Sequence, residues 1–103
     1  MISNQILQDT IEGIKAITRV DLCVMDVEGK ALATTLRDTE EYETSVLAFV
    51  DSPAESQMLS GYQFFKVFDD NQLEYVIIAK GEADDVYMIG KIATFQIQNL
   101  LVA

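Results

Sequence analysis

Two segments of this chain are apolar on both of their faces, and this feature limits the fold more than any other. Residues 20–25 contain one polar side chain, and in residues 73–80 Val76, Ile77 and Ile78 stand in a row. A strand that is apolar on both faces needs cover on both faces. The sequence therefore predicts a sheet with helices packed on each side.

The first half of the chain shows a helical pattern followed by a strand pattern. Apolar residues recur at helical spacing over about residues 3–17, and Ser3 or Asn4 can cap the start. Residues 26–29 have turn composition, because Asp opens turns and Gly adopts a positive φ. Residues 31–35 return as a second strand, so the pattern predicts a helix and then a hairpin.

A second helix is predicted next. Asp38 or Thr39 can begin it, and Glu41 stands three residues beyond Asp38, as a capping box requires. Pro53 ends the helix, because proline lacks the N–H that a helix interior needs.

The second hairpin begins with an aromatic-rich segment. Residues 62–68 predict a strand, which could begin before Gly61 and bend or bulge there. Residues 73–80 return after a polar turn. The order helix, hairpin, helix, hairpin, helix predicts one α+β domain over residues 1–103, with an antiparallel sheet of two hairpins.

The final helix, over about residues 86–102, has apolar residues on two opposite sides. One stripe contains Val86, Ile89, Ala93, Ile97 and Leu100. The other stripe contains Met88, Ile92, Phe95 and Val102. Either the first helix covers this second stripe, or the second stripe forms a homodimer contact through Met88, Ile92 and Phe95, which we favour. The helix stops within its apolar stripes, so we expect the chain to be the N-terminal part of a longer protein.

Charge and histidine content exclude several functions. The net charge is −10, which opposes binding of nucleic acid by this segment alone. Without histidine there is no Ser-His-Asp triad and no His-containing metal site. The single Cys23 indicates a reduced, cytoplasmic setting, and no apolar stretch is long enough for a membrane span. We expect a cytoplasmic protein that is not an enzyme, with no catalytic residues, cofactor or metal.

A small-molecule site is the chemistry that remains. The end of the first hairpin, the second helix and one face of the third strand carry polar and aromatic residues that the topology brings together. The candidate ligand-binding residues are Thr34, Thr35, Arg37, Tyr42, Tyr62, Phe64 and Lys66. Acids close to Arg37 favour a neutral or singly charged ligand. The competing interpretation is that the aromatic residues are core and the cations are surface.

The first hairpin resembles a known family. Residues 24–34, Val-Met-Asp-Val-Glu-Gly-Lys-Ala-Leu-Ala-Thr, are similar to the hairpin of PAS-like sensor domains at the N-terminus of carbohydrate-diacid regulators of the PucR type. Residues 64–68, 73–81 and 84–86, followed by a long helix, resemble the family's ending. The resemblance implies a PAS/GAF/profilin-like fold and a sensor of an acidic sugar that precedes a DNA-binding helix-turn-helix.

The chain departs from that family after Thr35. The family has a glycine-rich loop with arginine and histidine there, whereas residues 36–41 of this chain contain Arg37 among acids. The acidic-sugar ligand is therefore not carried over.

The resulting expectation is a sensory and dimerisation domain of a bacterial transcriptional regulator. The alternative is a protein-interaction scaffold of the roadblock or longin type, with no ligand. A cavity beneath the second helix would favour the sensor, and solid packing there would favour the scaffold.

Overall fold

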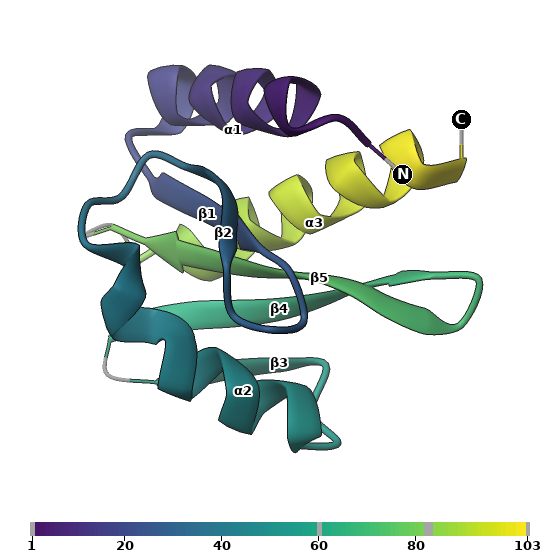
Figure 1. The fold of residues 1–103 in the computed structure, drawn as a ribbon. Helices are drawn as coiled ribbons and strands as arrows, with labels where there is room; N and C mark the ends of the chain where they lie inside the picture. Colours follow the sequence, from purple (N-terminus) through teal and green to yellow (C-terminus); the bar gives the residue numbers. More distant parts are fainter. Residues whose placement is uncertain (1, 60, 82–83, 103) are drawn as a thin grey trace.

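The computed structural model describes residues 2–59, 61–81 and 84–102. Its elements are α1 (Asn4–Thr18), β1 (Asp21–Met25), β2 (Ala31–Thr34), the 3₁₀ helix η1 (Thr39–Tyr42), α2 (Glu43–Asp51), β3 (Ser56–Leu59), β4 (Tyr62–Asp69), β5 (Gln72–Lys80) and α3 (Val86–Val102). They form an α+β fold around a single antiparallel sheet (Figure 1).

The five strands lie in the order β2-β1-β5-β4-β3. The segments that are apolar on both faces are β1 and β5, which pair from Asp21 with Lys80 to Met25 with Val76. Both strands lie inside the sheet rather than at an edge. Because both faces of these two strands are buried, helices must cover the sheet on each side. This gives the three-layered arrangement that the sequence predicts.

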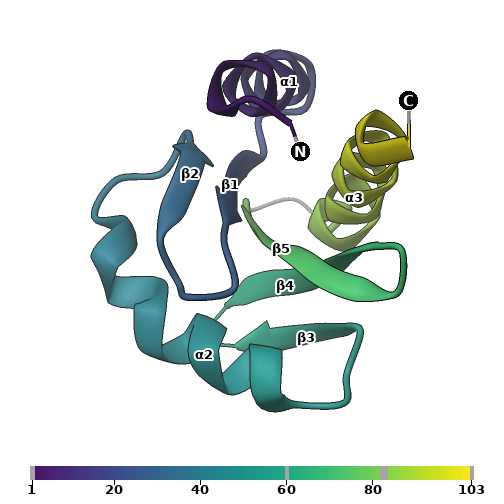
Figure 2. The same ribbon diagram turned by 45° about the vertical axis from the view of Figure 1, so that its right-hand side comes forward.

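Helices cover both faces of the sheet, as expected. α1 and α3 lie on one face and α2 on the other (Figures 1 and 2). The α1/α3 face is built around Leu7, Ile11, Phe65, Ile77 and Ile97. The α2 face is a separate cluster, described below, that includes the rings of Tyr42, Phe49 and Phe64.

Local signals fix the first hairpin and the helix before it. Ser3 caps α1, because its hydroxyl accepts a hydrogen bond from the N–H of Ile6 at 3.2 Å. In the β1–β2 turn, Asp26 accepts hydrogen bonds from the N–H groups of Glu28 and Lys30. Gly29 has φ +85°, which explains why the turn needs glycine.

Glutamine side chains hold the two long helices to the sheet. Gln8 of α1 both donates to the carbonyl and accepts from the N–H of Thr34, each at 2.9 Å, on strand β2. Gln98 of α3 makes the same pair of hydrogen bonds with the backbone of Phe68, next to a bulge in β4. Each amide satisfies backbone groups that the ladder leaves open.

The sheet has one strand more than the two predicted hairpins. Residues Ser56–Leu59 form β3, which pairs with β4 from Ser56 opposite Phe65 to Leu59 opposite Tyr62. Gly61, with φ +82°, belongs to the turn that reverses the chain, and is not a bend within one strand. The strand is short and half-exposed, so it has no strong apolar pattern to reveal it.

The second helix also differs from its prediction. Asp38 has φ +53° and makes no side-chain cap, and the segment begins as η1 before it continues as α2. Aspartate tolerates this left-handed conformation better than most residues. The expected capping box of Asp38 and Glu41 is therefore wrong, whereas the stop before Pro53 is confirmed, since α2 ends at Asp51.

Candidate functional site

Four of the predicted ligand-binding residues line one hollow of about 420 Å³. It lies where η1 approaches the ends of β1 and β5, and we call it the η1 hollow. The predicted members are Thr35, Arg37, Tyr42 and Tyr62. The other lining residues are Lys15, Asp21, Leu36, Asp38, Glu41 and Lys80.

The other three predicted residues lie elsewhere. Thr34 lines a neighbouring hollow. Phe64 is fully buried, with its ring centroid 5.8 Å from that of Phe49. Lys66 donates to the carbonyl of Ser52 and lies 5.0 Å from the Phe49 ring. A strand rises about 3.3 Å per residue, so a side chain four positions beyond Tyr62 lies too far along β4 to share its hollow.

Two tyrosines pack together at the η1 hollow. The hydroxyl of Tyr42 donates to that of Tyr62 at 2.9 Å, and their ring centroids are 4.8 Å apart in an edge-on arrangement. Burial, and then the hydrogen bond with Tyr62, raise the pKa of Tyr42. Lys80 lies 5.4 Å from the ring of Tyr62, which is a cation–π distance.

A second network joins α1 to the start of β1. Asp21 accepts from the hydroxyl of Thr35 at 2.8 Å and forms an ion pair with Lys15 at 2.8 Å. Thr35 in turn accepts from the N–H of Leu22 at 2.9 Å. Burial alone would raise the pKa of Asp21, but hydrogen bonds from Lys15 and Thr35 outweigh it and hold that pKa below its usual value.

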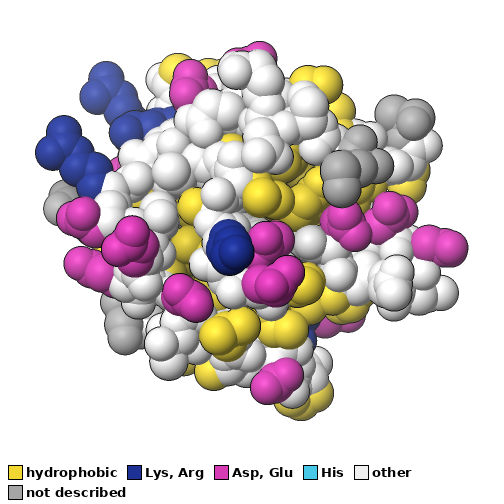
Figure 3. Space-filling model, in the orientation of Figure 1, with side chains coloured by type: hydrophobic (Ala, Val, Ile, Leu, Met, Phe, Trp, Pro, Cys, Tyr) yellow, Lys and Arg dark blue, Asp and Glu magenta, His cyan; other side chains and the backbone are white. Residues whose placement is uncertain are grey.

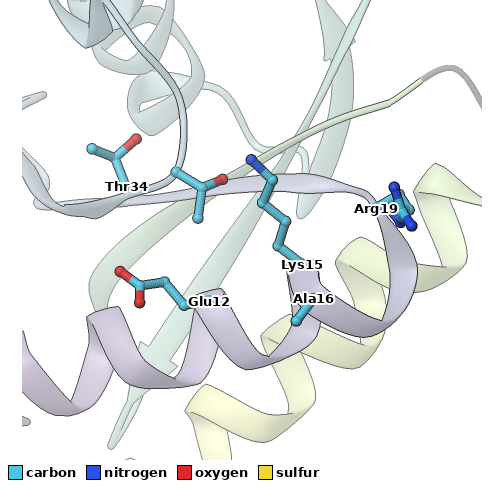
Figure 4. A pocket seen from close by; sticks show the side chains of 6 residues that line it. Glu12, Lys15, Ala16, Arg19 and Thr34 are labelled. Carbon is cyan, nitrogen blue, oxygen red and sulfur yellow. The ribbon is translucent and has the colours of Figure 1, made fainter.

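The neighbouring hollow, of about 530 Å³, lies between α1 and the end of β2; we call it the α1 hollow. Figure 4 shows Glu12 and Lys15 reaching from the helix towards the segment that carries Thr34, with Arg19 at the helix end. Lys15 and Thr35 line both hollows, so the two are adjacent.

Sequence reasoning missed three charged residues of the η1 hollow: Lys15, Asp21 and Lys80. Asp21 and Lys80 are paired in the sheet register at the ends of β1 and β5. The sequence feature that could have revealed Asp21 and Lys80 is that each is a charged residue at one end of a strand that is otherwise apolar on both faces. Lys15 could be found only from the position of α1 across β1, which no pattern within one helix reveals.

The space between α2 and the sheet is filled. Val46 and Phe49 of α2 are buried against Phe64, Met25 and Ile78 of the sheet. Cys23 is buried in the same cluster, and burial raises the pKa of its thiol to about 11. The η1 hollow therefore opens beside this cluster, at the η1 end, and not beneath α2.

The two predicted stripes of α3 differ in burial. The first is buried from Val86 to Ile97, with Leu100 packed at its edge. Met88, Ile92 and Phe95 of the second stripe remain exposed, so α1 does not cover them. A groove of about 380 Å³ between α1 and α3 has Ile92 in its lining; we call it the α1–α3 groove.

Charge is distributed unevenly over the surface. Most Lys and Arg atoms visible in Figure 3 gather at the upper left, where α1 ends in Figure 1, and acidic side chains are spread over the rest of that face. Four of the 7 cations line the two hollows: Lys15, Arg19, Arg37 and Lys80. By contrast, residues 86–102 contain no Asp or Glu in a chain that has 17.

Metal and membrane features were also sought within the described residues. In that part of the chain, no three His, Cys, Asp or Glu side chains gather as metal ligands would. The helices that the structure describes include none with the length and apolarity of a bilayer span. No protein-family model matches the sequence, and a search of curated proteins finds no match either.

Proposed function

We propose that this chain is the sensory and dimerisation domain of a bacterial transcriptional regulator and works in the cytoplasm. In this proposal, the domain is PAS-like and of the PucR type, and it binds a small molecule in the η1 hollow. The observation that carries the proposal is the convergence of Thr35, Arg37, Tyr42 and Tyr62 on that hollow from separate elements. The hollow holds the two rings of Tyr42 and Tyr62 among polar and charged groups, and polar groups of this kind fix the orientation of a ligand in small-molecule sites.

The dimerisation half of the proposal rests on the outer stripe of α3. Met88, Ile92 and Phe95 are exposed apolar residues on a helix without acidic side chains. Two copies that each carry a charge of −10 repel least where acids are absent. A homodimer contact at this stripe removes apolar surface from water at little electrostatic cost.

α1 gives a route from ligand to dimer. Its residues Glu12, Lys15 and Ala16 line the α1 hollow, together with Arg19 just beyond its end. On its other side, Gly13 and the residues around it line the α1–α3 groove, next to the outer stripe. A ligand that favours one position of α1 would shift the dimer contact, and through it a DNA-binding part beyond α3.

A thermal-shift screen tests the proposal. Sugar acids, short carboxylates and nucleosides are screened, because a ligand that binds only the folded state raises the melting temperature. The screen is repeated with Arg37→Ala and Tyr62→Ala. We expect at least one compound to raise the melting temperature of the unmodified chain and to do so less in both variants. A hit that neither substitution weakens would place the ligand outside the η1 hollow.

A second function, a roadblock- or longin-like interaction scaffold without a ligand, is favoured by a different observation. α2 packs on the sheet through the buried side chains of Val46 and Phe49, and none of the hollows described above lies beneath it. The scaffold requires partner binding but no small-molecule binding. A domain that dimerises, and that no compound in the screen stabilises, would be assigned to this second function.

A further inference from the structure

The lining of the η1 hollow carries charges of both signs in equal number. The cations are Lys15, Arg37 and Lys80, and the carboxylates are those of Asp21, Asp38 and Glu41. Lys15 and Asp21 neutralise each other at 2.8 Å, and no second ion pair forms among the residues that the structure describes. Two cations and two carboxylates therefore share the hollow without contacting a charge of opposite sign there.

The neutral polar groups of the hollow already have partners. The hydroxyl of Tyr42 donates to Tyr62, and the hydroxyl of Thr35 donates to Asp21. A ligand thus finds the Tyr62 hydroxyl as a neutral donor and, besides it, the charged groups, which form the stronger hydrogen bonds.

This charge pattern discriminates between ligand classes. A dianion would lie close to Asp38 and Glu41, and a simple cation would lie close to Arg37 and Lys80. Repulsion between like charges opposes each of these ligands. A molecule that carries one positive and one negative group satisfies both sets at once. The volume of about 420 Å³ lies towards the small end of the range for small-molecule sites, about 300–1,000 Å³.

We infer that the η1 hollow binds a small zwitterion of the amino-acid type. This inference rests on the proposed sensory function and specifies its ligand. The guanidinium of Arg37 pairs with the ligand carboxylate, for which its planar fork is suited, and Lys80 adds positive charge beside the ring of Tyr62. Asp38 and Glu41 accept hydrogen bonds from the ligand ammonium group.

The test compares amino acids with derivatives that lack one charge. The common L-amino acids are titrated into the whole chain by calorimetry, and every one that binds is compared with its N-acetyl and its carboxamide derivative. We expect each derivative to bind at least about tenfold more weakly, since losing a hydrogen bond between charged groups costs about 1.5–3 kcal/mol. Removal of either charge should weaken binding.

Two variants and a control locate the site. Arg37→Gln should weaken binding of the amino acid and of its carboxamide unequally, with the larger loss for the form that has a carboxylate. Glu41→Gln should discriminate in the same way between the amino acid and its N-acetyl form. Both side chains are exposed, so folding should be unaffected. Lys30→Gln is the matched control, because Lys30 is exposed in the β1–β2 turn and lies outside the hollow.

The outcomes separate this inference from the sensor proposal. If a derivative binds as tightly as its parent, or if only sugar acids or nucleosides bind, the zwitterion inference is wrong and the sensor proposal stands. Amino-acid binding that neither variant alters would overturn the assignment to this hollow. If neither the amino acids nor the compounds of the wider screen bind, both proposals fail together.

Discussion

Two neighbouring residues of β4 point to opposite faces of the sheet and pack in the two different cores. Phe64 of β4 points to the α2 face, where its ring lies 5.8 Å from that of Phe49. Phe65 points to the α1/α3 face, where its ring packs beside Gly90 of α3 and 5.5 Å from Tyr87. Both phenylalanines are fully buried, so the sheet itself is equally well covered on its two sides.

The difference lies in the outer surfaces of the helices. Around α2 and η1, acidic side chains such as Glu40, Glu41 and Asp51 face solvent. On the other side, α3 presents Phe95 with 66% of its surface exposed, and α1 presents Ile17. On α3 this exposed surface carries no acid, although Asp9 of α1 lines the neighbouring α1–α3 groove. An exposed apolar patch of this kind is typical of a partner contact. The comparison teaches that α2 exposes a single large apolar side chain, Leu47, whereas α3 exposes a stripe with Met88, Ile92 and Phe95 and so has more apolar surface left for a partner.

The largest expected effect on stability comes from creating a cavity in the core on the α2 face of the sheet. Phe64→Ala should lower the free energy of unfolding by about 3–5 kcal/mol, because it leaves a cavity among rigidly packed side chains. Urea unfolding at one fixed protein concentration measures the change. Phe65→Ala should cost a similar amount on the opposite face. A loss below about 1 kcal/mol for Phe64→Ala would show that the α2 face is loosely packed, which would contradict the comparison.

A pair of glycines tests how closely α3 approaches the sheet. A Cβ at Gly90 would lie 2.2 Å from the Phe65 ring, so Gly90→Ala should cost about 1–3 kcal/mol through overpacking. At Gly13 of α1 a Cβ meets nothing within 4 Å, so Gly13→Ala should stabilise the fold by about 0.5–1 kcal/mol. The same urea experiment compares them. Equal effects at the two positions would mean that α3 lies farther from β4 than the structure places it.

These contacts also show what could be predicted from the sequence. The periodicity predicted α1, β1, β2, β4, β5 and α3 close to their observed bounds, because each has a strong apolar pattern. It did not predict β3, whose position depends on pairing with β4, or the break between η1 and α2, which follows from the left-handed backbone of Asp38.

The candidate site was predicted in part for a similar reason. Thr35, Arg37, Tyr42 and Tyr62 lie on segments whose order and direction the pattern gave, and they meet at one hollow. Lys15 and Lys80 contribute from α1 and from the end of β5, and their position depends on how the layers cross. The spacing of residues along one segment does not reveal how two layers cross in space.

The third prediction concerns the exposed apolar stripe of α3. Phe95→Asp should weaken the proposed homodimer by at least about tenfold, because the dimer would then bury an unpaired charge. The free energy of unfolding of the monomer should hardly change, since Phe95 is exposed in the single chain. Light scattering and sedimentation over a concentration series measure the association.

Leu47→Asp is the matched control, because Leu47 is 42% exposed but lies on α2, which covers the opposite face of the sheet. It should leave association unchanged. If Leu47→Asp separates the dimer and Phe95→Asp does not, copies meet at α2 and not at α3. If the unmodified chain is monomeric at high micromolar concentration, the homodimer proposal is wrong.

The smallest expected effect is electrostatic and lies where α1 joins the sheet. The pKa of Asp21 is lower in the folded chain than in the unfolded chain, because hydrogen bonds from Lys15 and Thr35 outweigh the effect of its burial. The contribution of ionised Asp21 to the free energy of unfolding is therefore fully present above the unfolded pKa of about 3.9. It is lost as the pH falls through the lower pKa of the folded chain. Asp21→Asn should remove this part of the acid dependence and cost about 0.2–1 kcal/mol at neutral pH, as partly exposed ion pairs do. Urea unfolding at pH values from neutral down to about 3 measures it, with Asp51→Asn as the control, since Asp51 is exposed on the α2 layer. If the two variants lose stability alike at every pH, the Lys15–Asp21–Thr35 network does not hold α1 against β1.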